Sequence, residues 1–473
     1  MSVSRFVRPL PLTHLSHHAG TLLVLLGGTL VVPAAVALLL ADGVQAGVFT
    51  GVAAGTAALG WLLRRAPRRA LGLREAMALT AAAYVLFALA GATAFLRVAG
   101  PTDAFFEAMS GFTTTGLTVM DVEALPRSLL FFRGYSQWLG GAGIIVLSLV
   151  VLAGPGSAGA KLYAAEFGQQ NLMGNVVATG RIVIGIYAAV TAAGIVALWA
   201  AGAGAFDGLV HGLSLASTGG FTPFPDSFAA YDAAPVAAAA GVFMAIGATS
   251  LPLAVIVWRR GWRRLTDDAQ LRTLVVLIAV GTAALALFGA EPDQGLAAGA
   301  FHATSAVTTT GFQISDPAEW TDGARLTTAG LMIVGGSLGS TAGGIKLLRL
   351  VIILRVVSWA VSRALLPAQA AIPVKVQHAT VDESEVRHTF ALVAAYFLLL
   401  FTCAVALSAA GAQFEDAVFE VISGLSTVGL SVGVTSPDLP AWAKLLLAFT
   451  MWVGRIEILA ALVLLHPRNW LRG

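Results

Sequence analysis

Ten apolar runs dominate the sequence, and each is long enough to cross a lipid bilayer as a helix. A spanning helix needs roughly 20 apolar residues to cross about 30 Å of hydrocarbon. Only 11% of the 473 residues are charged, far below the roughly 25% usual in soluble domains. We therefore predict an all-α integral membrane protein. The runs lie at residues 20–41, 46–63, 76–99, 128–153, 182–203, 235–258, 273–290, 326–358, 390–411 and 441–466.

Charged residues are distributed unevenly between the loops that join these runs. Lys and Arg gather at residues 64–74, 259–264, 346–355 and 466–472, whereas the alternate loops carry Asp and Glu. Cytoplasmic loops of membrane proteins carry an excess of Lys and Arg. We therefore predict that both chain termini are cytoplasmic. The net charge of +3 reflects the basic residues of these cytoplasmic loops. We therefore expect no soluble basic domain that could bind nucleic acid.

The sequence contains few residues that could carry redox or catalytic chemistry. Cys403 is the only cysteine and lies in an apolar run, which excludes an intrachain disulfide and a CxxC-type metal or redox site. No catalytic triad, acid pair or cofactor-binding loop is evident, so we do not expect an enzyme.

One short motif occurs four times, each time between two apolar runs. The stretch "FEAMSGFTTTGL" (106–117) aligns without gaps to "VHGLSLASTGGF" (210–221), "FHATSAVTTTGF" (301–312) and "FEVISGLSTVGL" (419–430). All four copies have Ser at the fifth place, Ser or Thr at the eighth, Thr at the ninth and Gly at the eleventh. Such self-similarity indicates a repeat architecture.

The motif predicts four helix–pore loop–helix repeats around a pseudo-fourfold pore. An N-terminal extension of two helices precedes them. The predicted regions are residues 1–70 for this extension and 71–155, 156–265, 266–385 and 386–473 for pore repeats 1 to 4, with a broken second helix in repeat 3.

Each motif copy is typical of a half-helix that enters the membrane and turns back. The segment is too short to span, and irregular backbone at membrane depth needs cover from protein or water. Four half-helices would direct the partial negative charge of their C-terminal ends toward one centre. The following Thr-x-Gly segments would add carbonyl and hydroxyl oxygens that hold a dehydrated cation. The predicted filter residues are Thr114, Thr115, Gly116, Thr218, Gly219, Gly220, Thr309, Thr310, Gly311, Thr427, Val428 and Gly429.

A second glycine-rich stretch, "GGSLGSTAGGIK" (335–346), interrupts the apolar run 326–358. Gly and Ser permit a break in the helix, so the stretch could form a flexible plug below the filter. Small residues also allow close helix packing, and composition alone leaves both interpretations open. The candidate gate residues in this stretch are Gly335, Gly336, Gly339, Ser340, Thr341, Gly343, Gly344 and Lys346.

Arg455 and Glu457 interrupt the final apolar run. Ionisable groups at membrane depth are costly and usually face a cavity or a partner. We expect Arg455 to contact carbonyl groups of the 335–344 stretch and to hold it closed by repelling cations. The alternatives are a structural ion pair and a side chain that reaches the membrane surface.

Two histidines occupy the second place of the motif, where the other copies have Glu107 and Glu420. His211 and His302 therefore share a packing or filter-support role in this interpretation. A metal pair is disfavoured because no four-ligand set with metal spacing accompanies them. Arg133 and Lys161 are expected at the membrane interface.

Three further stretches, together with the four motif copies, carry a resemblance to a known family. They are "SQWLGGAGIIVL" (136–147), "GGSLGSTAGGIK" (335–346) and "MWVGRIEIL" (451–459). Over nearly its whole length the chain resembles the Trk/Ktr/HKT superfamily of potassium transporters, and within it the bacterial TrkH/TrkG type. The resemblance implies that residues 335–346 and Arg455 form a gate.

The resemblance also implies the ion and the partners. Serine at the first filter glycine accompanies sodium selectivity in the plant branch, whereas all four positions here are Gly, which implies K⁺. It further implies a homodimer in the cytoplasmic (inner) membrane of a bacterium, in contact with membrane lipids. The chain ends about seven residues after its last run, so we expect any ligand sensing to come from another polypeptide. The resemblance implies that this is a cytoplasmic ring of TrkA-type regulators that bind NAD or ATP. Its expected docking surface is loops 259–272 and 346–375.

Two features leave the degree of selectivity open. The stretch "MAIGATSLPL" (244–253) lacks the Gly-Gly pattern expected there, and Val428 replaces the Thr found in two other copies. The sequence does not separate channel-like flux from coupled flux. A sodium-permeable or H⁺/Na⁺-coupled symporter of the same fold is therefore the alternative function.

Overall fold

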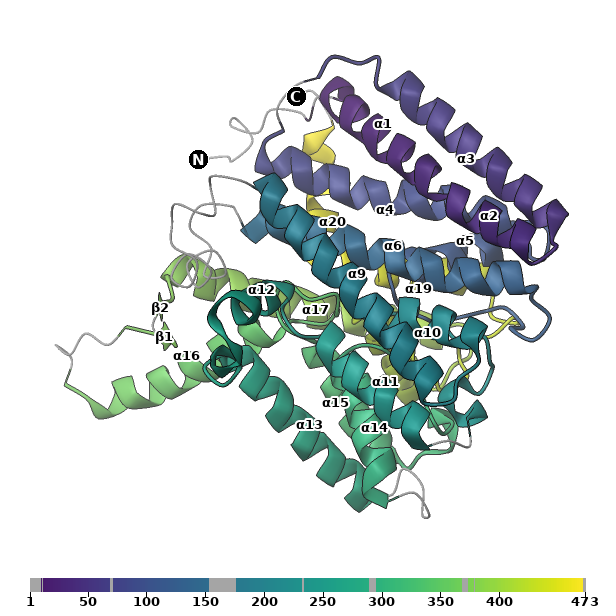
Figure 1. The fold of residues 1–473 in the computed structure, drawn as a ribbon. Helices are drawn as coiled ribbons and strands as arrows, with labels where there is room; N and C mark the ends of the chain where they lie inside the picture. Colours follow the sequence, from purple (N-terminus) through teal and green to yellow (C-terminus); the bar gives the residue numbers. More distant parts are fainter. Residues whose placement is uncertain are drawn as a thin grey trace.

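The computed structural model describes residues 10, 12–68, 71–152, 176–231, 234–288, 295–367, 373–377 and 379–470. Helices make up nearly all of the regular structure (Figure 1). In chain order, the α-helices of the described residues are α1 Leu12–Thr29, α2 Val31–Leu39, α3 Gly43–Leu63, α4 Leu73–Phe95, α5 Pro101–Phe112, α6 Arg127–Leu152, α9 Val176–Ala200, α10 Ala205–Ser217, α11 Ala234–Gly247, α12 Leu251–Arg260, α13 Ala269–Phe288, α14 Gly295–Val307, α15 Asp322–Val334, α16 Leu347–Leu365, α17 Glu383–Ser408, α18 Phe414–Leu425, α19 Ala441–Arg455 and α20 Ile458–Leu465.

Short elements join these helices. Strands β1 (Lys375–Val376) and β2 (Ala379–Thr380) pair antiparallel. The 3₁₀ turns are η2 Ser227–Ala230, η3 Trp262–Leu265, η4 Pro317–Glu319 and η5 Pro467–Asn469.

The helices follow the predicted repeat order. Each repeat has a long first helix, a short helix that carries the motif, and a second long helix that is continuous or broken. These sets are α4–α5–α6, α9–α10–α11/α12, α13–α14–α15/α16 and α17–α18–α19/α20. Helices α1 to α3 form the N-terminal extension along the outer side of α4 and α6 (Figure 1). The exact division at 70/71, 265/266 and 385/386 stays a prediction, and the division at 155/156 lies outside the described residues.

Length and composition allow six helices of the described part to cross a membrane, or up to eight if each of two bent pairs is one span. The bent pairs are α11/α12, with an angle of 93°, and α19/α20, with an angle of 114°. The other two predicted runs form α6 and, interrupted by residues 335–346, α15 with α16. Most of the described residues of all ten predicted apolar runs therefore lie in helices. The runs 235–258, 326–358 and 441–466 are broken by a bend or a loop, and the run 20–41 is divided between α1 and α2 at Leu30.

Many apolar side chains face outward from the long helices. Leu39, Leu287 and Leu398 are 86%, 80% and 68% exposed. Exposed leucines at this density are costly in water, whereas they suit contact with lipid tails. The motif helices differ, because eight consecutive or nearly consecutive residues of α5 and α18 are buried.

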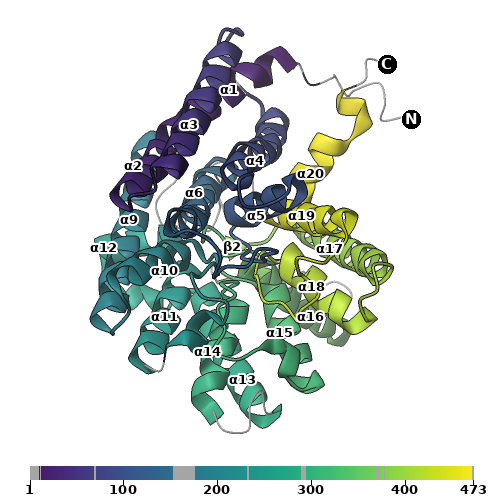
Figure 2. The same cartoon turned by 90° about the vertical axis from the view of Figure 1, so that its right-hand side faces the viewer.

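The four short helices stand around a common centre that is filled by loops (Figure 2). Helix α5 begins with Gly100 in extended conformation followed by Pro101, a pairing that favours a helix start. Helix α10 ends at Thr218, which adopts the left-handed conformation. Local sequence therefore sets where these helices begin and end. Their side chains are buried, which fits their position around the centre of the fold.

Candidate ion filter and gate

The segments that follow the four short helices share one backbone conformation. The ninth-place residues Thr114, Thr218, Thr309 and Thr427 have φ of 55°, 52°, 55° and 52°, and the eleventh-place Gly116, Gly220, Gly311 and Gly429 have φ of 98°, 80°, 78° and 99°. A β-branched residue with positive φ is strained by of order 1–3 kcal/mol. Its occurrence in all four copies indicates that the fold imposes this conformation. We call residues 113–117, 217–221, 308–312 and 426–430 the filter segments.

The filter segments contact one another in a closed cyclic order. A Cβ atom added to Gly116 would overlap the carbonyl oxygen of Gly219 in the second segment. Gly220 in turn faces the carbonyl of Thr310, and Gly311 faces that of Val428. The fourth segment closes the order, because Gly429 faces the carbonyl of Thr115. Larger residues at the four glycines would therefore collide with the neighbouring segment as well as strain the backbone.

Hydroxyl groups from the short helices hold these segments in place. Ser110 and Ser423 each accept a 3.0 Å hydrogen bond from the N–H of the filter glycine in their own repeat. Ser305 donates to the carbonyl of Phe312 at 2.6 Å. The predicted repetition of Ser at the fifth place thus has a structural role in each of these copies.

The second segment is supported by Gln137 of α6. Ser214 donates to Gln137 Oε1 at 2.7 Å, and the same oxygen accepts from the N–H of Phe221 at 3.1 Å. The Gln137 amide also donates to the carbonyl of Gly219. Gln137 lies in "SQWLGGAGIIVL", but no pattern in the sequence predicted this role.

The second-place residues connect each short helix to the chain that leaves the filter. Glu107 accepts from Thr118 Oγ1, and Glu420 accepts from Ser431 Oγ. The histidines make the corresponding contacts. His211 Nε2 lies 3.2 Å from Thr222 Oγ1, and His302 Nε2 lies 3.1 Å from Ser315 Oγ. Both histidines are buried, and their contacts are consistent with the predicted packing or filter-support role.

Arg133 was expected at the membrane interface, and this prediction is wrong. Its side chain is 2% exposed and its Nε donates to Glu107 Oε1 at 2.6 Å. It also donates to the carbonyl of Thr222 at 2.9 Å and lies 4.1 Å above the ring of Phe221. Burial is tolerated because the carboxylate of Glu107 compensates the charge. Lys161 lies outside the described residues.

Ion pairs join neighbouring repeats at the N-terminal ends of the short helices. Lys444 of α19 donates to Asp103 of α5 at 2.6 Å, and Arg325 of α15 donates to Asp416 of α18 at 3.2 Å. Each basic residue comes from the repeat before the one that holds its partner, with repeat 4 followed by repeat 1. Acidic groups at a helix N-terminus are favourable in themselves, so these carboxylates have two stabilising partners.

Residues 335–346 form an irregular loop between α15 and α16, which we call the gate loop. In this loop, the backbone N–H of Gly343 donates a hydrogen bond to Thr309 Oγ1 at 2.7 Å. Thr341 Oγ1 donates to the carbonyls of Ala216 and Gly247 at 3.2 and 3.1 Å. The tip of the gate loop therefore lies directly against the ends of α10 and α11 and against the filter segment that follows α14.

The backbone of the gate loop requires its glycines. Gly335, Gly339 and Gly344 have φ of 73°, 80° and 72°. Gly343 leaves no room for a side chain, because a Cβ there would overlap the carbonyl of Ser426 and the hydroxyl of Thr427. The ammonium group of Lys346 donates to the carbonyl of Ala342 within the loop. Among the candidate gate residues of this stretch, Gly335, Gly336, Gly339, Ser340, Thr341, Gly343 and Lys346 are buried, and Gly344 is half-buried.

Arg455 is the last residue of α19 and makes the contact that the sequence analysis expected. Its Nη1 donates to the carbonyl of Thr341 at 2.6 Å, and its Nη2 donates to the carbonyl of Gly140 at 3.2 Å. The side chain is 3% exposed. A buried guanidinium thus connects the gate loop of repeat 3 with α6 of repeat 1.

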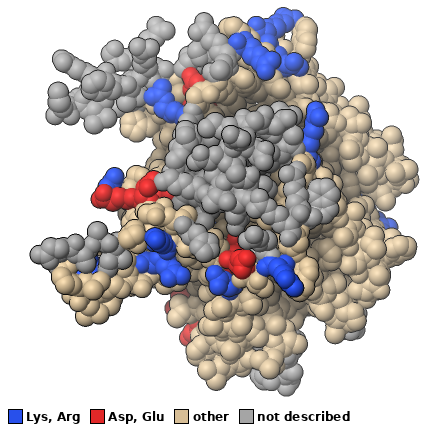
Figure 3. Space-filling view, turned by 60° about the vertical axis from the view of Figure 1, so that its left-hand side comes forward, with Lys and Arg blue, Asp and Glu red and all other residues tan. Residues whose placement is uncertain are grey.

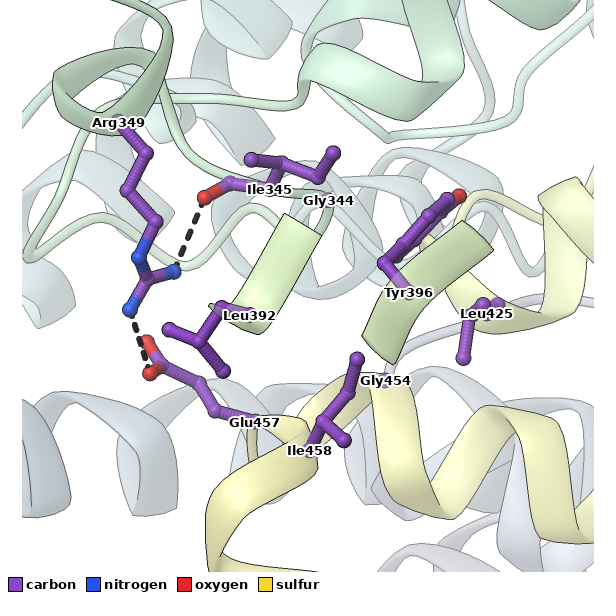
Figure 4. A pocket seen from close by; sticks show the side chains of 9 residues that line it. All are labelled: Gly344, Ile345, Arg349, Leu392, Tyr396, Leu425, Gly454, Glu457 and Ile458. Carbon is purple, nitrogen blue, oxygen red and sulfur yellow. Dashed lines mark hydrogen bonds and ion pairs between the residues drawn. The ribbon is translucent and has the colours of Figure 1, made fainter. Parts of the chain in front are cut away.

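Glu457 pairs with a different residue. It lies at the bend between α19 and α20, and Arg349 Nη2 donates to its Oε2 at 2.6 Å. Arg349 Nη1 also donates to the carbonyl of Ile345 at the end of the gate loop, at 2.9 Å. Both contacts border a small cavity beside the gate loop (Figure 4). The cavity is lined by Gly344, Ile345, Arg349, Leu392, Tyr396, Leu425, Gly454, Glu457 and Ile458.

The polar groups at this centre suit a monovalent cation. They are backbone carbonyls and hydroxyls, which are hard oxygen ligands, and the C-terminal ends of four short helices add partial negative charge. Within the described residues, no three His, Cys, Asp or Glu side chains gather as ligands for a metal ion. The long apolar helices, together with a centre rich in carbonyl and hydroxyl groups, are typical of a multi-pass membrane protein that transports cations.

Comparison with known proteins identifies the family. The family model described as "TrkH: Cation transport protein" matches residues 56–471. The chain belongs to this family.

Two relatives and one solved structure match along almost their full lengths. The Trk system potassium uptake protein TrkH of Halomonas elongata is 34% identical over 95% of this chain and 98% of its own. The protein of the same name from Escherichia coli strain K12 is 28% identical over the same shares. The crystal structure of the potassium transporter TrkH from Vibrio parahaemolyticus superposes with a TM-score of 0.87 at 27% identity. That match covers 98% of this chain and 100% of the other.

Proposed function

We propose that this protein takes up potassium across the cytoplasmic membrane of a bacterium, through one path that crosses the four filter segments. The observation that carries this proposal is the closed cyclic contact between these segments, each with the same backbone conformation. Four segments around one axis can surround an ion with carbonyl oxygens that replace its hydration shell. The four predicted sets of filter residues supply these oxygens.

Potassium is favoured over other cations by the filter glycines and by the relatives. All four eleventh-place residues are Gly, and the proteins from Halomonas elongata and Escherichia coli are named as potassium uptake proteins. Val428 is consistent with this ion, because its carbonyl supplies the contact to Gly311 while its side chain is fully buried.

The gate loop and Arg455 would close the path below the filter. The gate loop lies against Thr218, Thr309 and Thr427 of three filter segments, and the guanidinium of Arg455 adds a positive charge beside it. A fixed positive charge in a region of low dielectric constant raises the energy of a cation nearby. Flux would therefore require the gate loop to move and Arg455 to lose its contact with Thr341.

The charge distribution supports cytoplasmic termini. The face in Figure 3, which is the left-hand side of the view in Figure 1, shows several groups of Lys and Arg side chains and fewer of Asp and Glu. The N-terminal and C-terminal segments lie together, since the N–H of Leu10 donates to the carbonyl of Asn469 at 2.7 Å. Cytoplasmic faces carry such an excess of basic residues.

A homodimer that docks on a TrkA-type ring binding NAD or ATP is the proposed assembly. Segments 259–272 and 346–375 are the proposed docking surface, and both reach the gate loop. The second segment was expected to be a loop, but most of its described residues form helix α16. The N–H of Leu338 in the gate loop donates to Gln270 Oε1 at 2.8 Å, and α16 begins where the gate loop ends. Displacement of either segment by a partner would therefore act on the gate loop directly.

The experiment measures K⁺ and Na⁺ uptake into proteoliposomes for the wild type, Gly116→Ser and Gly51→Ser. A side chain at Gly116 meets the carbonyl of Gly219, whereas Gly51 on α3 faces open space. We expect potassium-selective uptake that Gly116→Ser impairs and Gly51→Ser preserves. Uptake that is indifferent to the cation and to Gly116→Ser would contradict the filter. Uptake of K⁺ that requires a Na⁺ or proton gradient would favour the symporter.

A further inference from the structure

The tenth place of the motif separates repeat 2 from the other three copies. It holds Thr115, Thr310 and Val428 in repeats 1, 3 and 4, and Gly219 in repeat 2. A β-branched side chain is stiff and packs against its surroundings, whereas Gly has no side chain to pack and the greatest backbone freedom. Because Gly219 is followed by Gly220, the filter segment of repeat 2 has the least local restraint of the four.

The tenth-place side chains of the other repeats are all fully buried. Thr115 Oγ1 lies 2.8 Å from the hydroxyl of the eighth-place Thr113, and Thr310 Oγ1 lies 2.8 Å from that of Thr308. In repeat 4, Val428 fills this place with an apolar side chain. The two hydroxyl contacts tie the filter backbone to the end of its own short helix. Repeat 2 has no tenth-place side chain that could do so.

Gln137 occupies the space that a side chain at Gly219 would need. A Cβ atom built on Gly219 would overlap Cδ and Oε1 of Gln137 and would also lie close to its Cβ. Gln137 belongs to α6 of repeat 1 and is 0% exposed. The glycine of repeat 2 and the glutamine of repeat 1 therefore fit together, and a neighbouring repeat supplies the side chain that the segment itself lacks.

The amide of Gln137 bonds to the backbone on both sides of Gly220. Its Nε2 donates to the carbonyl of Gly219, and its Oε1 accepts from the N–H of Phe221 at 3.1 Å. The N–H and C=O of a planar trans peptide point in opposite directions. The bond to the Phe221 N–H therefore turns the carbonyl of Gly220 away from Gln137. Ser214 Oγ donates to the same Oε1 at 2.7 Å and holds the amide in this orientation.

We propose that Gln137 is a positioning residue of the filter and that it determines, from repeat 2, the selectivity between K⁺ and Na⁺. The inference rests on the proposed function, in which filter carbonyls surround the ion. Gln137 holds the Gly219 carbonyl against Gly116 of repeat 1 and fixes the direction of the next carbonyl. Without the amide, this stretch of two glycines can rotate. Its oxygens can then adapt to the smaller Na⁺, and K⁺ loses its advantage.

Two buried glutamines allow a matched comparison. Gln137→Met removes the amide and keeps a side chain of similar length. Gln45→Met is the control, because Gln45 of α3 is 1% exposed and its Nε2 donates to the carbonyl of Ala94 in α4 at 3.0 Å, within the N-terminal part of the fold. Both glutamines thus lose a buried amide that bonds to a backbone carbonyl, but only Gln137 contacts the filter.

Thermal unfolding of the full chain in detergent measures cation binding. KCl or NaCl replaces N-methylglucamine chloride at constant ionic strength, and a cation that binds the folded protein raises the unfolding temperature by mass action. The ratio of the two apparent affinities is the selectivity of binding. Uptake of K⁺ and Na⁺ into proteoliposomes gives KM and the maximal rate for the same variants.

We expect Gln137→Met to lower the ratio of K⁺ affinity to Na⁺ affinity roughly 2- to 13-fold, the factor that corresponds to the loss of one hydrogen bond. Uptake should show a higher KM for K⁺ at a similar maximal rate. Gln45→Met should lower the unfolding temperature without cation and leave the ratio unchanged. Gln137→Glu keeps the acceptor oxygen and lacks the donor to Gly219, so its ratio should also fall. This variant decides the question if Gln137→Met does not fold.

A double variant tests whether Gln137 replaces a tenth-place side chain. Gln137→Ala/Gly219→Thr removes the glutamine and places at residue 219 the Thr that repeats 1 and 3 have there. Its hydroxyl can bond to that of Ser217, which holds the eighth place. The affinity ratio should therefore recover above that of Gln137→Ala alone.

Three outcomes would overturn the role of Gln137. The first is an unchanged affinity ratio in a Gln137→Met protein that binds and takes up K⁺. The second is an equal fall of the ratio in Gln45→Met, which would indicate general loosening of the fold. The third is a double variant no more selective than Gln137→Ala. Selective K⁺ binding that Gln137→Met weakens, in a wild-type protein without uptake, would support the role of Gln137 and count against the proposed transport function.

Discussion

Arg455 and Thr341 are joined by a 2.6 Å hydrogen bond from the guanidinium Nη1 to the backbone carbonyl oxygen. The bond links the second helix of repeat 4 to the tip of the gate loop in repeat 3. A second hydrogen bond from the same guanidinium reaches Gly140 of repeat 1. The buried guanidinium of Arg455 therefore connects repeats 1, 3 and 4.

Replacement of Arg455 by Ala should raise basal potassium flux. The change removes both hydrogen bonds and the positive charge that stabilise the closed gate loop. Hydrogen bonds to charged groups contribute about 1.5–3 kcal/mol, so the open population should rise on the order of 10- to 100-fold while it is small. Uptake into proteoliposomes at equal protein content checks this. Unchanged flux would show that Arg455 has only a structural role.

Gly343→Ala should also increase flux, for a steric reason. A Cβ at this position overlaps the carbonyl of Ser426 and the hydroxyl of Thr427, so the gate loop cannot keep its closed position. Gly330→Ala in α15 is the matched control, because no atom lies within 4 Å of a Cβ there. Equal flux in the two variants would show that the gate loop does not limit transport.

Arg133→Met should strongly destabilise the protein. Removal of one partner leaves the carboxylate of Glu107 buried and uncompensated, which typically costs about 3–5 kcal/mol. The double variant Arg133→Met/Glu107→Leu should recover much of this loss. Thermal unfolding in detergent measures both, with Glu383→Gln in an exposed pair as the control that should change little. A double variant less stable than Arg133→Met would show that Glu107 has other essential partners.

The two ion pairs between repeats should differ in their contribution to stability. Lys444 and Asp103 are 6% and 30% exposed, whereas Arg325 and Asp416 are both 25% exposed. Lys444→Met should therefore lower the unfolding temperature more than Arg325→Met, because the less solvated pair is screened less by water. Melting curves recorded at low and high salt test this order. The opposite order would mean that burial does not decide the strength of these pairs.

Arg349 and Glu457 provide a test of coupling between repeats 3 and 4. Glu457→Gln weakens the ion pair beside the cavity and should loosen the start of α16, which raises basal flux. The exchange Arg349→Glu/Glu457→Arg should restore flux toward the wild-type value. The two charges trade places in this variant, so the attraction between the two positions is kept. Measurement of all four members of the double-mutant cycle isolates the pair. Additive effects would show that the two residues act independently.

The comparison of sequence with structure is most instructive for the motif copies. Short apolar segments that end in Thr-x-Gly predicted half-helices at 106–117, 210–221, 301–312 and 419–430, and α5, α10, α14 and α18 lie there. Residues 335–346 predicted a broken helix, and the chain breaks between Val334 and Leu347. Local composition sufficed in these cases, because Gly and short apolar runs limit backbone conformation directly.

The partners of the polar residues could not be predicted in the same way. No local pattern pairs Arg133 with Glu107, Gln137 with Ser214, or Arg349 with Glu457, and Arg133 was expected at the membrane interface instead of inside the protein. These contacts join residues from different helices and repeats. Which side chains meet depends on how the helices pack, and helical periodicity does not contain that information.

The sequence by itself therefore determined the membrane class, the ten apolar segments, the fourfold motif and the glycines that permit the filter conformation. Only the tertiary structure decided that the filter segments contact one another in a closed cyclic order. It also decided that the gate loop of repeat 3 lies against the hydroxyls of repeats 2, 3 and 4. The physical reason is range: backbone preference and hydropathy act within a few residues, whereas ion pairs, carbonyl contacts and steric exclusion depend on segments brought together by folding.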